Sequence, residues 1–169
     1  WERLDMSNFR GTRQDYAVLL VAASKAAKLA DPFAQVLASE PGGMDLGFIA
    51  YLCQEPTRDS FDAICLNPRV ETPELAARYF SVLKAVLQKT GSGPAKKIYV
   101  TDWSFPISQD AAGSPLHFDP VELSSFVVKA YAVAFSMGAE RVFWTALRDS
   151  EANSPKGSSW GLLDAAVQP

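Results

Sequence analysis

The chain has 169 residues, of which 48% are hydrophobic and 21% are charged, and its formal net charge is -3. This is the composition of a globular domain that can bury a sizeable core. The small negative charge excludes the basic stripe of a nucleic-acid-binding protein and a polybasic membrane patch. No apolar run approaches the roughly 18 residues that a membrane-spanning helix needs.

Cysteine and histidine are too scarce for several kinds of site. Cys53 and Cys65 are too few for a disulfide framework and lack metal-ligand spacing, so we expect buried thiols. His117 is the only histidine, which argues against a histidine-built zinc site or catalytic triad within this chain.

The chain opens at Trp1 without an initiator methionine and stops at Pro169, so we expect it to be cut from a longer protein.

Helix-like and strand-like segments alternate along the chain. Thr12 to Asp15 has a capping-box pattern and predicts an amphipathic helix that ends near Asp31-Pro32. Three further helices are predicted at about Met44–Gln54, from Pro73 to the break at Gly91, and from Pro120 to Gly138. Apolar segments between the helices predict strands at Gln35–Ala38, Ala63–Leu66, Lys97–Thr101 and Arg141–Leu147.

The order of these elements predicts parallel strands joined by right-handed helical crossovers. Two α/β architectures have this order, an open doubly wound sheet and part of a closed (β/α)₈ barrel. No glycine-rich phosphate-binding motif follows a strand, so the nucleotide-binding version of the open sheet lacks its signature. Polar residues follow every strand, as they do at the mouth of barrel enzymes: Ser39-Glu40, Asn67–Arg69, Asp102-Trp103 and Arg148-Asp149. The pattern favours a barrel without excluding the open sheet.

Five stretches of the chain, taken in order, share the pattern of one group of enzymes. They are Trp1–Asp5 with Asn8-Phe9, Gly11-Thr12 and Asp15–Ala17; Ala26–Lys28 with Ala30–Pro32; Phe61–Ile64 with Asn67-Pro68 and Thr72–Glu74; Ile98–Trp103; and Gly138 with Arg141–Trp144 and Trp160–Leu163. Together these stretches resemble clan A glycoside hydrolases, closest to the family 39 xylosidase and exopolysaccharide-hydrolase type. In that family the first two correspond to the W-N-E-P-N segment after strand four and its following helix, and the third to strand six and its following helix. The fourth corresponds to the T-E-W segment of strand seven, and the fifth to strand eight and the loop after it.

The resemblance implies that residues 1–169 are the C-terminal half of one (β/α)₈ barrel, with strands five to eight and their helices. It implies a carbohydrate as ligand; we expect no cofactor and no metal. An extracellular or periplasmic location agrees with the resemblance, but the sequence leaves the compartment unknown. A half barrel leaves open sheet edges and an uncovered interior. We therefore expect strands one to four, in the same natural protein, to be the structural partner of this segment.

The resembled enzymes retain the anomeric configuration by using two carboxyl groups about 5–5.5 Å apart. Both are glutamates in the family, and this chain departs at both positions. Arg3 stands at the acid/base position, with Glu2 at the preceding asparagine, and an arginine cannot give up its proton near neutral pH. Asp102 stands at the nucleophile position, where its shorter side chain withdraws the carboxylate by about 1.5 Å. A misplacement of that order can cost about a hundredfold in rate.

A third departure follows strand six, where Asn67-Pro68-Arg69 replaces the family's His-Pro-Tyr. These replacements favour a carbohydrate-binding relative with degenerate catalytic residues. Two alternatives stay open. One is an active retaining hydrolase with Asp102 as nucleophile and Glu2 or Glu40 as acid; the other is an assembly scaffold, in which Asp102 forms an ion pair with Arg3, Arg69 or Arg148.

Tryptophans near strand ends are candidates for sugar stacking, because a flat aromatic face can bury the apolar C–H surface of a sugar ring. Trp144 is the preferred platform, since the resembled family places a tryptophan there. The same side chains could instead pack the barrel mouth. The predicted substrate-binding set is Trp1, Arg3, Asn67, Arg69, Trp103 and Trp144.

Overall fold

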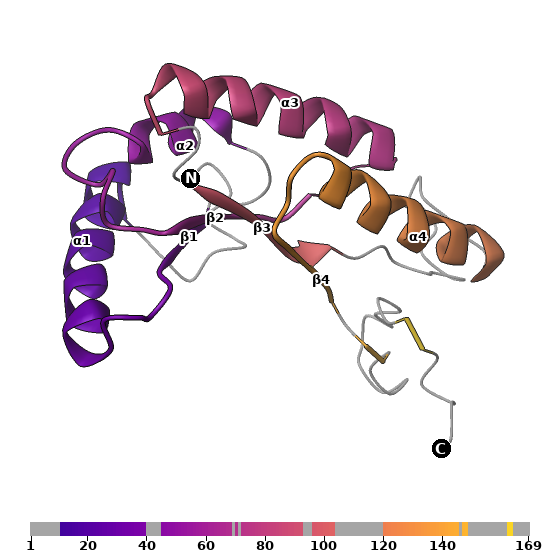
Figure 1. Ribbon diagram of the computed structural model, residues 1–169, viewed down its shortest axis with the longest axis horizontal. Helices are drawn as coiled ribbons and strands as arrows, with labels where there is room; N and C mark the ends of the chain where they lie inside the picture. The colour runs from indigo at the N-terminus through magenta and orange to yellow at the C-terminus, as the bar shows by residue number, and fades with distance from the viewer. Residues whose placement is uncertain are drawn as a thin grey trace.

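The computed structural model describes residues 11–39, 45–68, 70, 72–92, 96–103, 120–145, 147–148 and 162–163. Helices and strands alternate throughout this part of the chain (Figure 1). The elements are α1 (Arg13–Ala30), β1 (Leu37–Ser39), α2 (Leu46–Leu52), β2 (Ala63–Leu66), α3 (Pro73–Lys89), β3 (Lys97–Trp103), α4 (Pro120–Ser136) and β4 (Arg141–Trp144). No helix among the described residues is long and apolar enough to cross a membrane.

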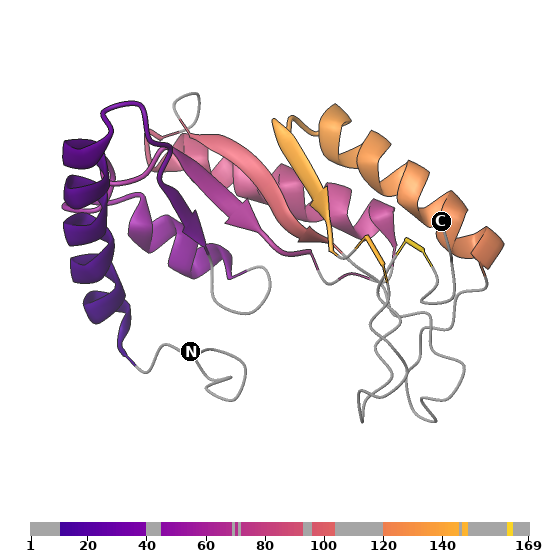
Figure 2. The same ribbon diagram turned by 90° about the horizontal axis from the view of Figure 1, so that it is seen from below.

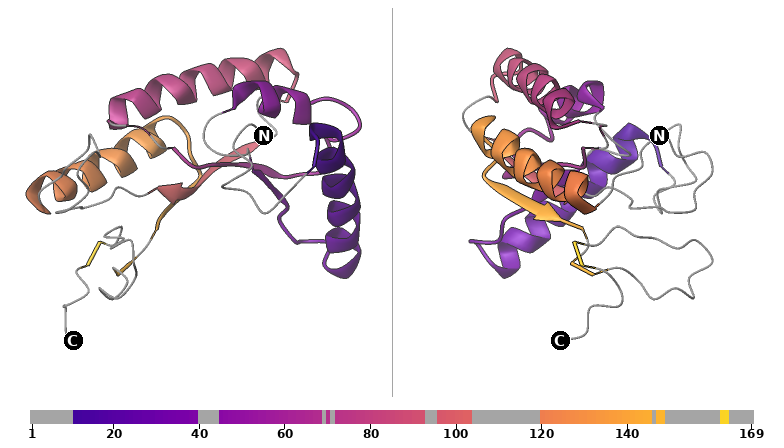
Figure 3. Two further views of the ribbon diagram at one scale, coloured as in Figure 1. Left: turned by 180° about the vertical axis from the view of Figure 1, so that it is seen from behind. Right: turned by 90° about the vertical axis from the view of Figure 1, so that its right-hand side faces the viewer.

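The strands form one parallel sheet in the order β1-β2-β3-β4. Successive strands are therefore neighbours, without the reversal of order that defines a doubly wound sheet. The helices follow one another in an arc along one side of the sheet, as Figure 1 and the view from behind in Figure 3 show. Seen from below in Figure 2, the strands run side by side and end at the same edge. This is the arrangement of consecutive β/α units in part of a (β/α)₈ barrel.

Helix ends follow the sequence signals closely. The Thr12 hydroxyl accepts from the Asp15 backbone N–H at 3.1 Å, and the Asp15 carboxylate accepts from the Thr12 N–H at 2.7 Å, which completes the predicted capping box. Thr72 caps α3, with Pro73 in its first turn. Gly138, just after α4, has φ +86°, a conformation that costs glycine no steric energy. These three predictions are confirmed.

The side of the sheet that faces the helices forms the main apolar core. Ile64 and Leu66 of β2 and Ile98 and Val100 of β3 belong to one buried cluster with side chains of α3 and α4. The members on α3 and α4 are Ala76, Phe80, Leu83, Leu87, Leu123, Phe126, Ala130 and Ala134. The two-residue spacing on each strand is the alternation that places one set of side chains on one face.

The other face of the sheet carries the alternate residues. Ala63, Cys65 and Tyr99 are buried but stand outside the helix-side cluster. Cys53 and Cys65 are both free and buried, which confirms the prediction of buried thiols.

At the carboxyl end of β1, the Tyr16 hydroxyl donates to the Ser39 carbonyl and accepts from the Ser39 N–H, each at 3.3 Å. This contact ties α1 to the carboxyl end of the sheet.

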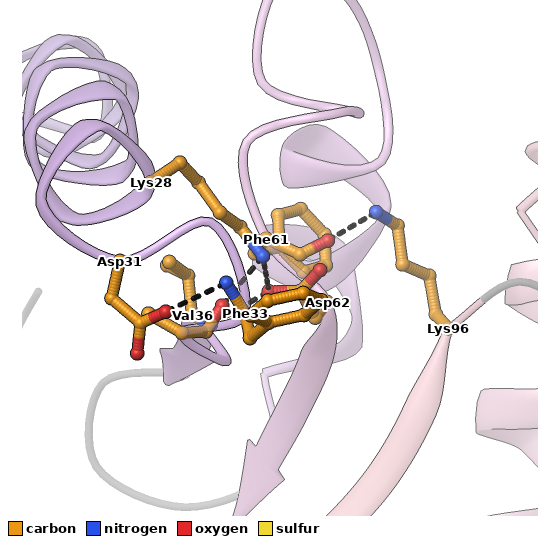
Figure 4. A network of polar contacts seen from close by, with 8 residues as sticks. Lys28, Asp31, Phe33, Val36, Phe61, Asp62 and Lys96 are labelled. Carbon is orange, nitrogen blue, oxygen red and sulfur yellow. Dashed lines mark hydrogen bonds and ion pairs between the residues drawn. The ribbon is translucent and has the colours of Figure 1, made fainter.

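A polar network holds the opposite, amino-terminal edge of the sheet (Figure 4). Asp62 accepts from Lys28 Nζ at 2.9 Å and from the Val36 N–H at 2.7 Å, which links α1 and the start of β1 to β2. Burial acts to raise the pKa of Asp62, but the hydrogen bonds from Lys28 and Val36 outweigh it and lower the pKa below its usual value. Nearby, Lys96 Nζ donates to the Phe61 carbonyl and lies 4.1 Å from the centre of the Phe61 ring.

Strand boundaries depart from the sequence prediction where pairing decides them. The first strand is shifted to Leu37–Ser39, and β4 ends at Trp144 instead of Leu147. The third strand runs two residues further than predicted, to Trp103. Local apolarity places a strand only approximately, because its ends depend on the hydrogen bonds that its neighbours offer.

Candidate functional site

Asp102 lies near the carboxyl end of β3, beside an irregularity in the sheet. Val100 pairs with Val142 and Trp103 pairs with Trp144, so two residues of β3 lie opposite one residue of β4. Such a bulge re-aims side chains and is common next to active sites. Here it returns Trp103 to the helix side of the sheet and leaves Thr101 and Asp102 between two helix-facing positions.

The Asp102 carboxylate has one oxygen, Oδ1, that is buried and accepts no hydrogen bond from any described residue. It forms no ion pair with Arg148, the one of the three predicted arginine partners that the structure describes. A buried acceptor without a partner costs about 1–3 kcal/mol. The carboxyl edge of the sheet therefore holds a carboxylate oxygen with unused hydrogen-bonding capacity.

Asn67 directly follows β2, which pairs with β3, the strand that carries Asp102. Its Oδ1 accepts from the Thr101 hydroxyl at 3.0 Å. The two residues continue the register in which Leu66 pairs with Val100, so they stand at the same level of adjacent strands. The structure thus brings Asn67, Thr101 and Asp102 to one edge of the sheet. Sequence reasoning singled out Asn67 and Asp102 and missed Thr101. Thr101 lies two residues after Tyr99, and this spacing on one strand could have placed both side chains on the same inward face.

Two of the candidate tryptophans pack against α4, which is the alternative to sugar stacking that the sequence left open. Trp103 is fully buried and its ring meets Phe126 of α4 edge to face, with centroids 6.3 Å apart. Trp144 meets the same Phe126 ring with centroids 6.4 Å apart. Both indole N–H groups are buried without a partner among the described residues. Packing against α4 leaves Trp103 no exposed face for a sugar, which corrects its assignment as a stacking residue in this structure; Trp144 stays half-buried.

The remaining predicted site residues lie outside the described ranges. These are Trp1, Glu2, Arg3, Glu40 and Arg69. The separation between Asp102 and a second carboxyl group, which distinguishes a retaining hydrolase, therefore stays a prediction. Arg148 is described, and it forms an isolated parallel bridge with Leu163.

The inward face of β2 and β3 continues below this edge with Cys65. Burial raises the pKa of the Cys65 thiol, and the neighbouring Thr101 hydroxyl opposes this shift. The thiol is therefore protonated at neutral pH and is a poor nucleophile. Within the described ranges, no group of three or more histidine, cysteine, aspartate or glutamate side chains could hold a metal ion.

A pocket of about 410 Å³ lies at the opposite, amino-terminal edge, between the C-terminal ends of α3 and α4. Three lysines line it, Lys84, Lys96 and Lys97, and Lys97 is paired with Glu140 at 2.9 Å. It contains none of the predicted site residues. In barrel proteins this edge serves stability and the carboxyl edge carries the chemistry.

Solved structures of sugar-cleaving enzymes share this architecture. A thermostable mutant of the xylanase Xyn10A from Cellvibrio japonicus has a TM-score of 0.65 and 14% identity, and the match covers 100% of this chain and 59% of the xylanase. Fungal beta-1,4-galactanases match at a TM-score of 0.58 and 19% identity over 89% of this chain and 50% of theirs. A beta-glucuronidase from Ruminococcus gnavus matches at 0.59 and 15% over 94% of this chain and 28% of its own.

The chain is part of a (β/α)₈ barrel. The consecutive parallel strands, the helices on one side and the matches to barrel glycoside hydrolases agree on this fold. The chain spans only a quarter to about six tenths of the structures that it matches, from 25% to 59% of their lengths. No family model matches the sequence, and no curated protein is significantly similar to it. At identities below 20%, the likeness to these structures establishes the fold and leaves the activity to be argued from the site.

Proposed function

We propose that this barrel segment binds a polysaccharide at the carboxyl edge of its sheet and that its catalytic residues are degenerate. The observation that carries the proposal is Asp102, a carboxylate at the mouth of the barrel with a buried oxygen that no described residue satisfies. A sugar hydroxyl is a donor of the kind this oxygen lacks. The structural neighbours, a xylanase, galactanases and glucuronidases, support a carbohydrate as the ligand class.

Two replacements support degeneracy. Arg3 stands at the position where the resembled family has its acid/base glutamate, and arginine stays protonated near neutral pH. Asp102 stands where that family has a longer nucleophile, so its carboxylate is withdrawn by about one bond length. Binding tolerates both changes better than hydrolysis does, because hydrolysis needs two carboxyl groups placed to within about 1 Å.

The second candidate function is retained hydrolysis with Asp102 as nucleophile and Glu2 or Glu40 as the acid. The same Oδ1 favours it, because no arginine or backbone N–H of the described residues engages this oxygen. The assembly scaffold, in which Asp102 is paired with an arginine, draws no support from Arg148, and Arg3 and Arg69 lie outside the described residues.

We further propose that residues 1–169 are the C-terminal half of one barrel domain, completed by strands one to four of the same natural protein. Within the described residues, the outer edges of β1 and β4 pair with no other strand of the sheet. Large apolar side chains are exposed at both ends of the half barrel: Val18, Leu19 and Leu29 on α1, Leu37 on β1, Val121, Val128 and Phe135 on α4, and Phe143 on β4. The missing strands and helices would cover these surfaces.

The test uses the full-length protein, a panel of soluble xylans, galactans and polyuronates, and matching aryl glycosides. Titration calorimetry should detect binding of at least one polysaccharide, and Asp102→Ala should weaken it about tenfold or more, since a hydrogen bond to a charged group contributes about 1.5–3 kcal/mol. Asp59→Ala is the matched control, because Asp59 is exposed at the opposite edge of the sheet. We expect it to bind like the wild type.

Hydrolysis of the aryl glycosides separates the two candidate functions. Turnover at background level in the wild type supports degeneracy. Turnover that Asp102→Asn abolishes establishes the hydrolase instead. A wild-type protein that binds none of the polysaccharides, or an Asp102→Ala protein that binds like the wild type, contradicts the proposal.

A further inference from the structure

The hydrogen bond between Thr101 and Asn67 holds the carbonyl end of the Asn67 side chain at the mouth of the barrel. The Thr101 hydroxyl donates to Asn67 Oδ1 at 3.0 Å. Leu66 and Val100, one residue earlier on each strand, are buried in the helix-side core. Because strand side chains alternate, Asn67 and Thr101 project from the opposite face, which is the inward face of a barrel.

This contact determines which polar atoms of Asn67 are left for a ligand. An asparagine amide carries one acceptor oxygen and two N–H donors. The oxygen is engaged by Thr101, and the amide nitrogen donates to no described residue. The Asn67 side chain is half-buried and does not hold a buried unsatisfied atom. The amide N–H groups therefore face away from Thr101 and are accessible.

The direction of the Thr101 hydroxyl depends on its other neighbour. Cys65 lies two residues before Asn67 on the same face of the sheet; burial raises the pKa of its thiol, and the neighbouring Thr101 hydroxyl acts to lower it. Because burial raises its pKa, the Cys65 thiol stays protonated at neutral pH, and its sulfur is a weaker acceptor for the Thr101 hydroxyl than Asn67 Oδ1. That proton is consequently free to bond Asn67 Oδ1.

We propose that Thr101 is a positioning residue, which holds the Asn67 carbonyl so that the Asn67 amide donates hydrogen bonds to the bound carbohydrate. The inference rests on the proposed carbohydrate-binding function and names the atoms that recognise the sugar. Asn67 supplies donors, and Asp102, on the neighbouring strand, supplies an unsatisfied acceptor. A sugar hydroxyl group suits the Asn67 donors, because its oxygen can accept from the amide N–H groups.

The binding test compares two substitutions of Thr101 in the full-length protein. Thr101→Val keeps the shape of the side chain and removes the hydroxyl, whereas Thr101→Ser keeps the hydroxyl. Titration with the polysaccharide that the wild type binds best should show an affinity about tenfold lower for Thr101→Val, with Thr101→Ser within about twofold of the wild type. Thr57→Val is the control, because the Thr57 hydroxyl donates to the Leu52 carbonyl at 2.8 Å, remote from the mouth. It should lower the melting temperature and leave the affinity unchanged.

Two results of this titration overturn the inference. One is a Thr101→Val protein that binds like the wild type. The other is a Thr101→Ser protein that binds no better than Thr101→Val, because a loss that the hydroxyl does not rescue is a packing effect.

A second measurement decides the orientation without any ligand. Atomic-resolution crystal structures of the full-length wild type and of Thr101→Val should show Asn67 Oδ1 on Thr101 in the wild type and a rotated or twofold-disordered amide in the variant. A wild-type amide with its nitrogen on Thr101 refutes the role of Thr101 even if polysaccharide binding is intact. A wild type with the expected amide that binds no polysaccharide refutes the proposed function, and with it the sugar contact assigned to Asn67.

Discussion

Removing the Asp102 carboxylate should make the protein more stable while it weakens ligand binding. Asp102 Oδ1 is buried and accepts no hydrogen bond from any described residue, an arrangement that costs about 1–3 kcal/mol. Asp102→Ala removes this cost together with the packing of one carboxyl group. We therefore expect the free energy of unfolding to rise by about 1 kcal/mol, which corresponds to about 2–4 °C in melting temperature for a domain of 150–250 residues.

The assay is urea denaturation of the full-length protein, followed by far-ultraviolet circular dichroism so that the signal does not depend on tryptophans near the mouth. Asp59→Ala, an exposed aspartate at the opposite edge, should change stability by less than about 0.5 kcal/mol. The measurement also separates the alternatives for Asp102. If an arginine outside the described residues pairs with this carboxylate, Asp102→Ala breaks a buried ion pair and should destabilise the protein by about 3–5 kcal/mol. A loss of that size refutes the reasoning from the unsatisfied oxygen.

Three further predictions concern stability. Leu83→Ala should cost about 2–5 kcal/mol in urea denaturation because Leu83 is fully buried, whereas Val82→Ala, at a half-exposed neighbour, should cost far less; equal losses would contradict the assigned core. Thr12→Ala should cost about 1 kcal/mol because it removes the capping box of α1, and an unchanged unfolding midpoint would show that the cap is not formed in solution. The pKa of Asp62 is lowered in the folded state, so its contribution is present above the unfolded pKa of about 3.9 and is lost as the pH falls through the lower, folded value. Asp62→Asn should therefore flatten the acid limb of a stability–pH profile from about pH 5 downward, and an unchanged acid limb would contradict the contact with Lys28.

The sequence by itself determined the helices and where they begin. The capping box at Thr12, the proline at the start of α3 and the glycine after α4 act within a few residues, so they can be read without knowing the fold. It also placed Asn67 and Asp102 at strand ends, and the common edge follows because parallel strands end together.

Only the tertiary structure decided between the open sheet and the barrel, because that choice depends on which strands become neighbours and on which side the helices lie. It also decided the surroundings of Asp102. The bulge in β3 arises from pairing with β4 and turns Trp103 toward Phe126, and the register between β2 and β3 sets Thr101 level with Asn67. Alternation along a single strand would have put Trp103 on the inward face. Register between strands is a long-range property, and no local pattern of residues encodes it.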